Sequence, residues 1–545
     1  MVKLPEAVEE NLHFLSAEIE GQLRALHDYF ESADEKIAAR LLTRSGYSDN
    51  LRARVQSACL RAYGRKPGSS NRGMILRSAD MVARNLDLIS RLSRRSVTHA
   101  SGIDHMELLR PEACAKAVAV VLENTRRAMP ALQAGDSRTA TRIGQASEKI
   151  EARYDQLFRT YTRDMRKTKH TEDLALSLLV AAEVRRMGEA LRGIGEAIVS
   201  ANIGQDVTFE RFATLQQVLD PKGRGGARLT LEPLAETRSG SAISGVRSKG
   251  AKSDAFDAVF KDGDADKVKE ERAGMKSWQS IYPGLAPRVL SYEKRGGSAA
   301  LLIEHLPGQT FEHLLLGQDS DLLAAAQARL SKTLRDIWKQ TRSDDPAQMG
   351  AMAQLKSRLP AVTRVHPEFG EGAGRIGTLD LPSLDTLITQ AAELEEGLPA
   401  PFCVYIHGDF NLDNIIYDPV EDRIHFIDVH RSRYQDFVQD VSVFMVSAYR
   451  LQIQDAATRA RLADAAAAIH KTAENFARRR RDKTYHARLA LGLARSFATS
   501  TRFVHYKSHA CRMMLRARFL LERLCAMPEG KADRLRVPVE DLFRD

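Results

Sequence analysis

The sequence predicts a multidomain chain in which an all-α region of two three-helix bundles precedes an α+β domain with two lobes. Three observations support this prediction. From residue 5 to about residue 202, apolar residues recur at three- and four-residue spacing, the period of an amphipathic helix, and no strand is evident. Short β-branched runs follow, and the pattern then becomes mainly helical again. A length of 545 residues corresponds to about three to four domains.

Changes of composition divide the chain into four expected parts. Residues 1–215 form the helical region, and residues 216–227, which are rich in glycine and other turn formers, form a linker. Residues 228–308 form a small lobe, with short β-leaning runs around one helix, Asp264–Ile281. Residues 309–545 form a larger, mainly helical lobe.

Turn-forming residues divide the helical region into six long helices. The first helix is expected to end at Gly46, where Asp49 is a candidate N-cap of the second. The later breaks fall at 64–73, 101–111, 135–137 and 169–171. Towards the end of the chain, Asp455–Asp482 and Tyr485–Met527 are expected as two further long helices, followed by a short tail.

The net charge of the chain favours some classes of binding partner over others. A net charge of +10 favours anionic partners such as nucleotides and phosphorylated substrates. Charge alone does not separate these from nucleic acid, which is nevertheless not a partner that we expect. The densest basic run, Arg478–Arg481, is either a solvated helix face or a patch that binds anions.

The cysteines and the lack of long apolar runs indicate a cytoplasmic protein. The five cysteines are widely spaced and form no CxxC pair, which indicates a reducing compartment and neither a disulfide framework nor a zinc site. Residues 1–14 lack the apolar core of a signal peptide, and no apolar run reaches the roughly 18 residues of a spanning helix. We therefore expect no integral membrane segment.

The stretch FCVYIHGDFNLDNIIYDPVEDRIHFIDVHR, residues 402–431, carries the residues best suited to chemistry. A hairpin is expected to set Asn414 and Asp428 on adjacent strands, because a turn-rich segment separates two β-leaning runs. Asp409, at the end of an earlier strand, can orient and deprotonate an acceptor hydroxyl. Asn414 and Asp428 offer the oxygen ligands that Mg²⁺ requires. His407 is expected to support the loop by hydrogen bonding.

Two motifs in this stretch are distinctive. HGDFNLDN at residues 407–414 matches the pattern HGDxxxxN, and Ile427-Asp428 follows at the end of the hairpin. In both, the chain resembles the aminoglycoside phosphotransferase and choline kinase-like branch of the protein-kinase-like fold. The resemblance covers residues 228–530 and implies an ATP-dependent phosphotransferase with ATP and Mg²⁺ as cofactors.

The resemblance implies a role for each matching residue. Asp409 would be the catalytic base, in a catalytic loop that also contains His407 and Asn414. Asn414 and Asp428 would hold Mg²⁺. Asp440 matches an acidic position that braces the loop.

The small lobe offers residues for the nucleotide. Lys261 ends a β-leaning run and could bind the α- and β-phosphates, held by Glu271 of the next helix, with Glu270 as the alternative. A surface lysine at a strand end remains the other interpretation of Lys261. Small residues that suit a turn covering the phosphates are Ser239, Gly240, Ser241, Ser244 and Gly245. In the connection between the lobes, the residues expected beside adenine are Glu304, His305 and Leu306.

The acceptor is expected to be a small molecule with a hydroxyl or amino group. Protein Ser/Thr kinases carry a lysine two residues after the catalytic aspartate, and this position is Asn411 here. Only twelve positions separate Asp428 from Asp440, which leaves no room for a long activation segment.

The helical region has two short signatures of its own. Arg77-Ser78-Ala79-Asp80 and Arg185–Glu189 lie at corresponding points of the two bundles. In these features, residues 10–203 resemble PhoU-like phosphate-signalling proteins. The resemblance implies a sensing or oligomerising role, through a signalling partner or a second copy of the chain.

The metal motif of the PhoU-like family, two carboxylates four residues apart, is incomplete in this chain. Asp80 and Glu189 each lack the second acid. Either they bind a metal ion nevertheless, or they are solvated or paired with Arg77 and Arg186.

These expectations combine into one functional prediction with two alternatives. The predicted function is an ATP-dependent phosphotransferase that the PhoU-like region regulates or assembles. The alternatives are a catalytically weak, nucleotide-binding regulator and a phosphate-signalling adaptor. In each case a fold alone does not name the ligand, because one fold hosts many acceptors.

Overall fold

The computed structural model describes residues 4–44, 46–65, 70–167, 169–209, 212, 229–236, 242–248, 258–295, 298–370, 372–528 and 530–544. The chain separates into two compact units, Met1–Gly263 and Asp264–Asp545. The predicted fold class is confirmed, since a long helical region precedes a part in which helices accompany small sheets. The predicted part boundaries stay predictions, and the linker at 216–227 lies outside the described residues. Within them, no helix is long and apolar enough to cross a membrane.

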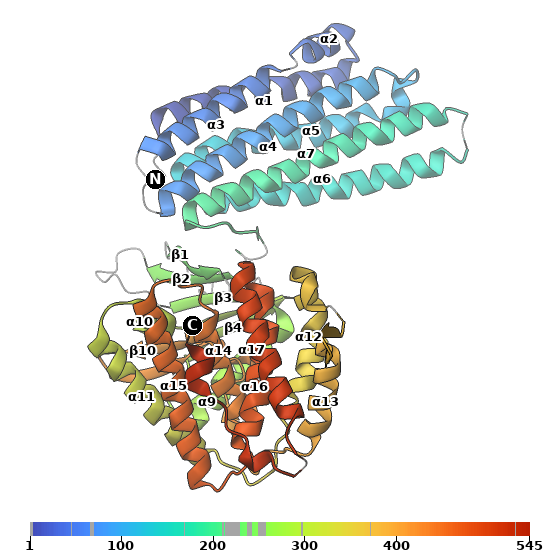
Figure 1. Cartoon of the computed structure of the whole chain (residues 1–545). Helices are drawn as coiled ribbons and strands as arrows, with labels where there is room; N and C mark the ends of the chain where they lie inside the picture. Colours follow the sequence, from blue (N-terminus) through green and yellow to red (C-terminus); the bar gives the residue numbers. More distant parts are fainter. Residues whose placement is uncertain are drawn as a thin grey trace. The chain divides into compact units, whose positions relative to one another are not determined.

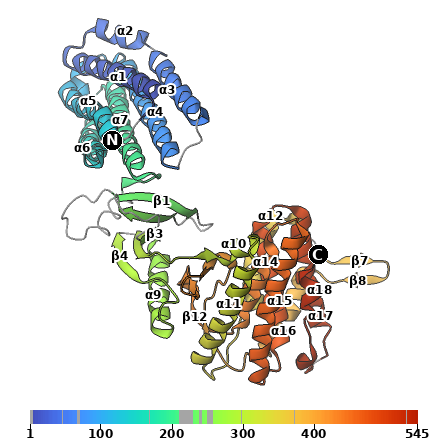
Figure 2. The ribbon, with the colours of Figure 1, turned by 90° about the vertical axis from the view of Figure 1, so that its left-hand side faces the viewer.

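The helical region consists of long helices that lie side by side (Figures 1 and 2). The helices are α1 (Glu6–Ser32), α2 (Glu35–Thr43), α3 (Tyr47–Arg65), α4 (Ser70–Ala100), η1 (Met106–Leu109), α5 (Pro111–Ala134), α6 (Ser137–Asp164) and α7 (Thr171–Ile203). Helices α1, α3 and α4 form one set of three, and α5, α6 and α7 form the other. Because α4 packs along α7 and α1 packs along α5, the two sets share one apolar core.

The prediction that the first helix continues to Gly46 is wrong, because α1 ends at Ser32. Ala33 has the left-handed conformation, with φ of 52°, and ends α1. The carboxylate of Asp34 then accepts the backbone N–H of Lys36 at 2.8 Å and caps the short helix α2. Aspartate is among the favoured N-cap residues, so this local hydrogen bond outweighs the helical pattern that continues through it.

Three antiparallel strands follow the helices of the first unit: β1 (Leu229–Glu236), β2 (Ala242–Ser248) and β3 (Ala258–Asp264). The predicted phosphate-covering turn is a strand from Ala242 onwards. Ser244 and Gly245 lie in β2, where Gly245 faces Glu232 of β1 and Val259 of β3. Hydrogen bonding to a strand on each side fixes these small residues in an extended conformation. Ser239, Gly240 and Ser241 belong to the connection from β1 to β2 and lie outside the described residues.

The second unit begins with a helix, a hairpin and further helices. These elements are α9 (Ala265–Ile281), β4 (Val289–Arg295), β5 (Ser298–Glu304), β6 (Gln309–Thr310), α10 (Phe311–Leu316), α11 (Ser320–Gln340), α12 (Ala351–Val365), η2 (Pro367–Gly370), β7 (Gly374–Ile376), β8 (Leu379–Leu381) and α13 (Leu384–Glu396). The hairpin of β7 and β8 projects from the unit in Figure 2.

The rest of the unit contains the predicted hairpin and the C-terminal helices. These elements are β9 (Val404–Ile406), η3 (Leu412–Asn414), β10 (Ile415–Asp418), β11 (Arg423–Phe426), η4 (Val429–Arg431), β12 (Arg433–Gln435), α14 (Val438–Arg450), α15 (Ala456–Arg479), α16 (Tyr485–Ser500), η5 (Thr501–Phe503), α17 (Lys507–Cys525), η6 (Ala532–Arg534) and α18 (Val539–Phe543).

The hairpin of β10 and β11 is confirmed, with one difference. Ile415 faces Phe426 and Asp418 faces Arg423, and β6 pairs on the other side of β10. Asn414 and Asp428 flank the hairpin instead of lying within its strands. The backbone N–H of Ile427 donates to the carbonyl of Asn414 at 3.0 Å, so the two segments remain adjacent beyond the strands.

The predicted single helix from Tyr485 to Met527 is two helices. α16 ends at Ser500 and α17 begins at Lys507. Nε2 of His366 lies 3.1 Å from the carbonyl of Thr501 and 2.8 Å from that of Val504. A buried side chain thus satisfies carbonyl groups that a continuous helix would have bonded internally.

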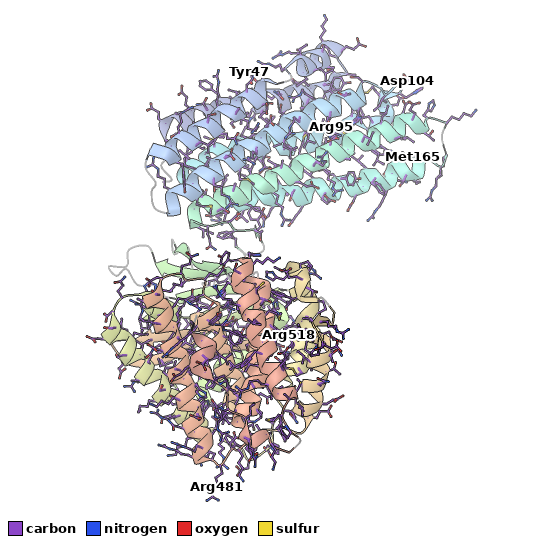
Figure 3. All side chains as sticks on the ribbon, viewed as in Figure 1. Tyr47, Arg95, Asp104, Met165, Arg481 and Arg518 are labelled. Carbon is purple, nitrogen blue, oxygen red and sulfur yellow. The ribbon has the colours of Figure 1, made fainter. Side chains whose placement is uncertain are left out.

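The basic run that ends α15 is exposed. Arg478, Arg479, Arg480 and Arg481 are all accessible to solvent, and Figure 3 shows Arg481 at the tip of the unit. Positive charge at a helix C-terminus is favourable because it opposes the negative end of the helix dipole. The solvated interpretation of this run therefore fits the structure.

Candidate active site

The loop after β9 is held by the buried carboxylate of Asp440. Oδ2 of Asp440 accepts the backbone N–H of His407 at 2.7 Å, and Oδ1 accepts that of Gly408 at 2.9 Å. Asp440 therefore braces the loop as expected. Burial raises the pKa of Asp440 to about 7, although both N–H groups and the charge of Arg495 favour the ionised form.

His407 is a structural residue of the loop. Its Nδ1 accepts the backbone N–H of Asp409 at 3.3 Å, so Nε2 carries the proton and donates to the carbonyl of Ile427 at 2.9 Å. Full burial lowers the pKa of His407, which agrees with a neutral ring. The ring thus links the segment of Asp409 to the end of β11.

Both carboxylate oxygens of Asp409 have hydrogen-bond donors. Nδ2 of Asn411 donates to Oδ1 at 2.7 Å, and Nη1 of Arg431 donates to Oδ2 at 3.1 Å. Asp409 is only partly buried, so its carboxylate remains open to an acceptor. Two donors fix the orientation of the carboxylate plane, and a general base must be oriented towards the proton that it accepts.

Asn414 and Asp428 offer oxygen atoms to a cation. Nδ2 of Asn414 donates to the carbonyl of Asp409 at 2.8 Å, which leaves its Oδ1 as a ligand. Asp428 has a left-handed backbone, with φ of 59°, and its Oδ1 lies 3.1 Å from Nδ1 of His430. One amide oxygen and one carboxylate are donors that suit Mg²⁺, so this pair fits the predicted metal.

Close backbone packing fixes the position of these segments. Gly408 has φ of 86°, and a Cβ there would lie 2.3 Å from the carbonyl oxygen of Arg431. A Cβ at Gly274 of α9 would lie 2.2 Å from the carbonyl oxygen of Val429. Only glycine permits such a close approach. The segment that follows Asp428 is therefore in direct contact with the backbone of Gly274 and with that of Gly408.

The predicted nucleotide residues of the small lobe lie on separate elements. Lys261 on β3 and Glu271 on α9 are buried and engaged in polar interactions, and their pairing stays a prediction. The carboxylate of Glu304 is bound by Arg288, with Nη2 to Oε1 at 2.9 Å and Nε to Oε2 at 3.0 Å. This contact lowers the pKa of Glu304. Because the backbone N–H of Glu304 donates to the carbonyl of Arg288 at 3.0 Å, the backbone carbonyl is the part of Glu304 that could meet adenine. His305 and Leu306 follow it and are half-buried.

The predicted partners of the two bundle carboxylates are wrong. Asp80 forms an ion pair with Arg84 at 2.7 Å, and Glu189 forms one with Arg185 at 3.3 Å. Both pairs have the four-residue spacing that places two side chains one helical turn apart. Arg77 and Arg186, the expected partners, instead bind Asp206 and Glu183.

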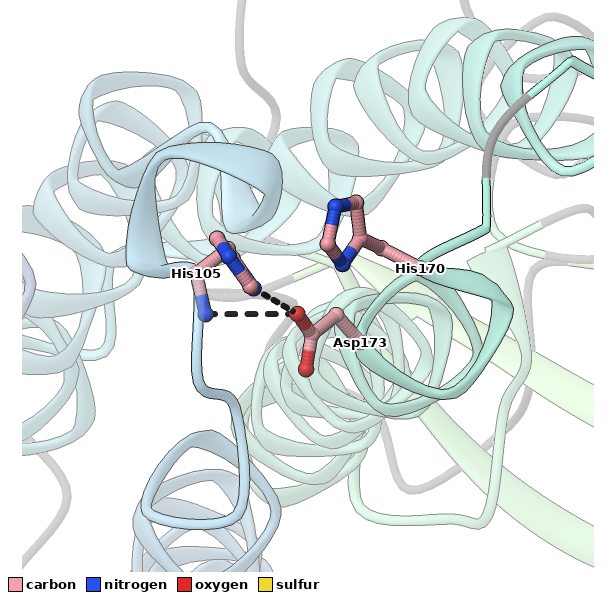
Figure 4. Close-up of side chains that lie close together, drawn as sticks. All are labelled: His105, His170 and Asp173. Atoms are coloured by element: carbon pink, nitrogen blue, oxygen red, sulfur yellow. Dashed lines mark hydrogen bonds and ion pairs between the residues drawn. The ribbon is translucent and has the colours of Figure 1, made fainter.

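Histidines that the sequence did not single out form three clusters with acids, one of which is His27, Asp28 and Glu31 on α1. Figure 4 shows His105, His170 and Asp173, whose ligand atoms lie within 4.8 Å of one another. Nδ1 of His105 lies 2.8 Å from Oδ2 of Asp173. The third cluster consists of His470, Glu474 and His486. Imidazole with carboxylate is a donor set for transition metals, but no sequence motif joins residues as far apart as those of the last two clusters.

Residues 259–483 match the phosphotransferase enzyme family. The match includes the motif at 407–414 and Asp428, and it confirms the predicted resemblance to phosphotransferases. No curated protein matches the chain by sequence.

Solved structures are similar to each part of the chain. PhoU from Pseudomonas aeruginosa is 15% identical over 36% of this chain and 95% of its own, with a TM-score of 0.34. Aminoglycoside-3'-phosphotransferase of type VIII is 18% identical over 54% of this chain and 98% of its own, with a TM-score of 0.33. Choline kinase from Cryptosporidium parvum Iowa II is 10% identical over 58% of this chain and 96% of its own, with a TM-score of 0.35.

Proposed function

We propose that this protein transfers the γ-phosphoryl group of ATP to a hydroxyl or amino group of a small molecule. The observation that supports this most is the arrangement of Asp409, Asn414 and Asp428 around one end of the hairpin, inside a phosphotransferase family domain. A base beside two oxygen ligands for Mg²⁺ is the set of groups that phosphoryl transfer requires.

In the proposed reaction, Asp409 orients the acceptor hydroxyl and accepts its proton. Asn411 and Arg431 keep the carboxylate in place by donating hydrogen bonds to it, and Asp440 holds the loop by accepting the backbone N–H of Gly408. Asn414 and Asp428 would hold Mg²⁺, which when bound would neutralise charge on the phosphates. Lys261, held by Glu271, is proposed to bind the α- and β-phosphates, and Glu304, His305 and Leu306 are proposed to lie beside adenine.

The test uses the full-length protein, Mg²⁺, ATP and a panel of hydroxylated and aminated acceptors. We expect ADP to form with at least one acceptor, and Asp409→Asn to lower the rate roughly 100- to 10,000-fold while ATP binding persists. Asp413→Asn is the matched control, because Asp413 is exposed in the same loop. Tight ATP binding without acceptor-dependent ADP formation would instead support the nucleotide-binding regulator.

We also propose that the helical region regulates or assembles the phosphotransferase. Its support is the fusion of a separate helical unit to the family domain in one chain. The test compares the full chain with a chain that lacks residues 1–215, by rate and by mass in solution. We expect the rate or the oligomeric state to change. If neither changes, this second proposal fails and the first one stands.

A further inference from the structure

Four arginines lie within electrostatic range of Asp409, and they come from four elements of the second unit. Arg431 of η4 contacts the carboxylate directly, at 3.1 Å. The others are Arg358 of α12, Arg495 of α16 and Arg502 of η5. We call these four residues the arginine cluster. The sequence shows no spacing that would join them, since Arg358 and Arg502 lie 144 positions apart.

Arg495 is the buried centre of the arginine cluster. Arg495 is 3% exposed, and its guanidinium donates to Oε1 of Gln354 at 3.0 Å and to the hydroxyl of Ser442 at 3.1 Å. Its remaining hydrogen-bond partner, Ser496, is also neutral. Burial lowers the pKa of Arg495 to about 10, so the group is charged at neutral pH. A buried cation with neutral partners is costly unless an anion lies nearby.

Arg358 lies on the same face of α12 as Gln354, one turn further along the helix. Because Gln354 binds Arg495, this face of α12 is directed towards α16. Burial lowers the pKa of Arg358, the positive charge of Arg431 lowers it further, and the negative charge of Asp409 raises it. Arg358 is therefore within electrostatic range of the catalytic carboxylate.

Arg502 reaches the same region from η5, directly after α16. η5 packs against α12, and the guanidinium of Arg502 lies 4.5 Å from the ring centroid of Phe503. Burial lowers the pKa of Arg502, as do the charges of Arg358 and Arg431, whereas Asp409 raises it. Within the described part of the chain, neither Arg358 nor Arg502 forms an ion pair.

The charges of the region do not balance. Against the arginine cluster stand three carboxylates: Asp409, Asp440 and Glu395. Glu395 already accepts the backbone N–H groups of Ala351 at 2.6 Å and Met352 at 2.9 Å. Asp440 has a pKa raised to about 7, so it is partly protonated at neutral pH. The surroundings of Asp409 thus carry an excess of positive charge that an anionic ligand would neutralise.

We propose that the phosphate acceptor is an anion, a hydroxylated compound with a carboxylate or phosphate group, and that Arg358 and Arg502 bind this group. This inference rests on the proposed function, because it names the acceptor class of the same site. Arginine suits the role, since its planar guanidinium binds carboxylate and phosphate with two parallel hydrogen bonds. A cationic acceptor would be repelled by the same residues.

The binding test uses the full chain saturated with ADP and Mg²⁺, so that the nucleotide phosphates already occupy their own site. The probes are glycerate as the anion, glycerol as its neutral counterpart and choline as the cation, each titrated while the melting temperature is followed. We expect glycerate alone to stabilise the protein. Arg358→Gln and Arg502→Gln should each weaken this effect roughly 10- to 100-fold, the range for a lost charged hydrogen bond.

Arg364→Gln is the matched control. Arg364 is on the same helix as Arg358 and is exposed, so this substitution should leave the effect of glycerate unchanged. If glycerate does not bind, the arginines are not an anion site and the inference is overturned. If ADP and Mg²⁺ abolish the binding of glycerate, the arginines bind the nucleotide phosphates, and the inference is overturned as well.

Turnover separates the failure of this inference from that of the proposed function. The acceptor panel is arranged in sets that share a carbon skeleton and differ in charge. We expect phosphorylation among the anionic members, with the Michaelis constant for the acceptor raised in Arg358→Gln and that for ATP unchanged. Asp409-dependent phosphorylation of a cationic acceptor would overturn the inference and leave the proposed function intact. Binding of glycerate without any turnover would contradict the proposed function, and only the anion-binding role of Arg358 and Arg502 would then stand.

Discussion

Asp440 holds the backbone N–H of His407 at 2.7 Å from a position that is only 3% exposed. The pKa of this carboxyl is raised from its ordinary value to about 7 by burial. Between about pH 4 and pH 7, the folded chain therefore binds a proton that the unfolded chain has released. Because the folded state binds more protons there, the stability contributed by this group falls as the pH rises through that interval.

The first prediction follows from this direction of the pH dependence of stability. It concerns the variant Asp440→Asn, whose side chain cannot titrate. The difference in melting temperature, wild type minus variant, should decline from pH 5 to pH 8 and level off above. Thermal melting of both proteins at four pH values measures it. A difference that stays constant with pH would show that Asp440 is ionised throughout.

Gly408→Ala should disrupt the loop that carries Asp409. The left-handed φ of 86° costs about 1 kcal/mol or more with a side chain, and the added Cβ would meet the carbonyl oxygen of Arg431. We expect phosphotransferase activity to fall by at least roughly tenfold, which corresponds to about 1.4 kcal/mol. Gly377→Ala is the control, since Gly377 has φ of 59° and no atom within 4 Å of the added Cβ. If both substitutions lowered the activity equally, the loss would come from the strained backbone conformation and not from the contact with Arg431.

Arg488→Met should destabilise the second unit strongly. The guanidinium of Arg488 is fully buried and pairs with the equally buried carboxylates of Asp436 and Asp482. Removing the cation leaves two buried anions, which costs about 3–5 kcal/mol. Urea denaturation measures the loss. The variant that also carries Asp436→Asn and Asp482→Asn should recover part of it, and a loss below about 1 kcal/mol in the single variant would contradict the ion-pair argument.

Asp428→Asn should raise the Mg²⁺ concentration that gives half-maximal activity. The substitution removes the only charge of the Asn414 and Asp428 ligand pair. A loss of about 1.4 kcal/mol of binding free energy corresponds to a tenfold lower affinity for Mg²⁺. A titration of Mg²⁺ at saturating ATP measures the shift. Asp413→Asn should leave the curve in place, and an unshifted curve for Asp428→Asn would exclude Asp428 as a ligand.

The hairpin and its flanking residues could be predicted because their signals are local. His407, Asn414 and Asp428 lie within 22 positions of one another, and the turn between the two runs determines which strands meet. The brace by Asp440 followed from its matching position in a family motif. Periodicity likewise located the long helices, since six of them recur with clear polar and apolar faces.

The errors concern places where one residue decides the structure or where distant elements meet. The cap at Asp34 could have been predicted from residue type, but the helical pattern on both sides obscured it. The break at Ser500 depends on His366, which is 134 positions away. The arginine cluster depends on how α12 packs against α16 and η5, and periodicity does not reveal which helices become neighbours.

Helix α9 is fixed to the catalytic segments at two points. Gly274 allows it to touch the backbone of Val429, and Nε1 of Trp278 donates to the hydroxyl of Ser432 at 2.8 Å, which in turn donates to the carbonyl of His407 at 3.1 Å. The helix that carries Glu271 is thus packed directly against the turn that carries Asp428. We therefore expect α9 to move together with the loop of Asp409 in any opening and closing of the domain, and the pivot to lie elsewhere.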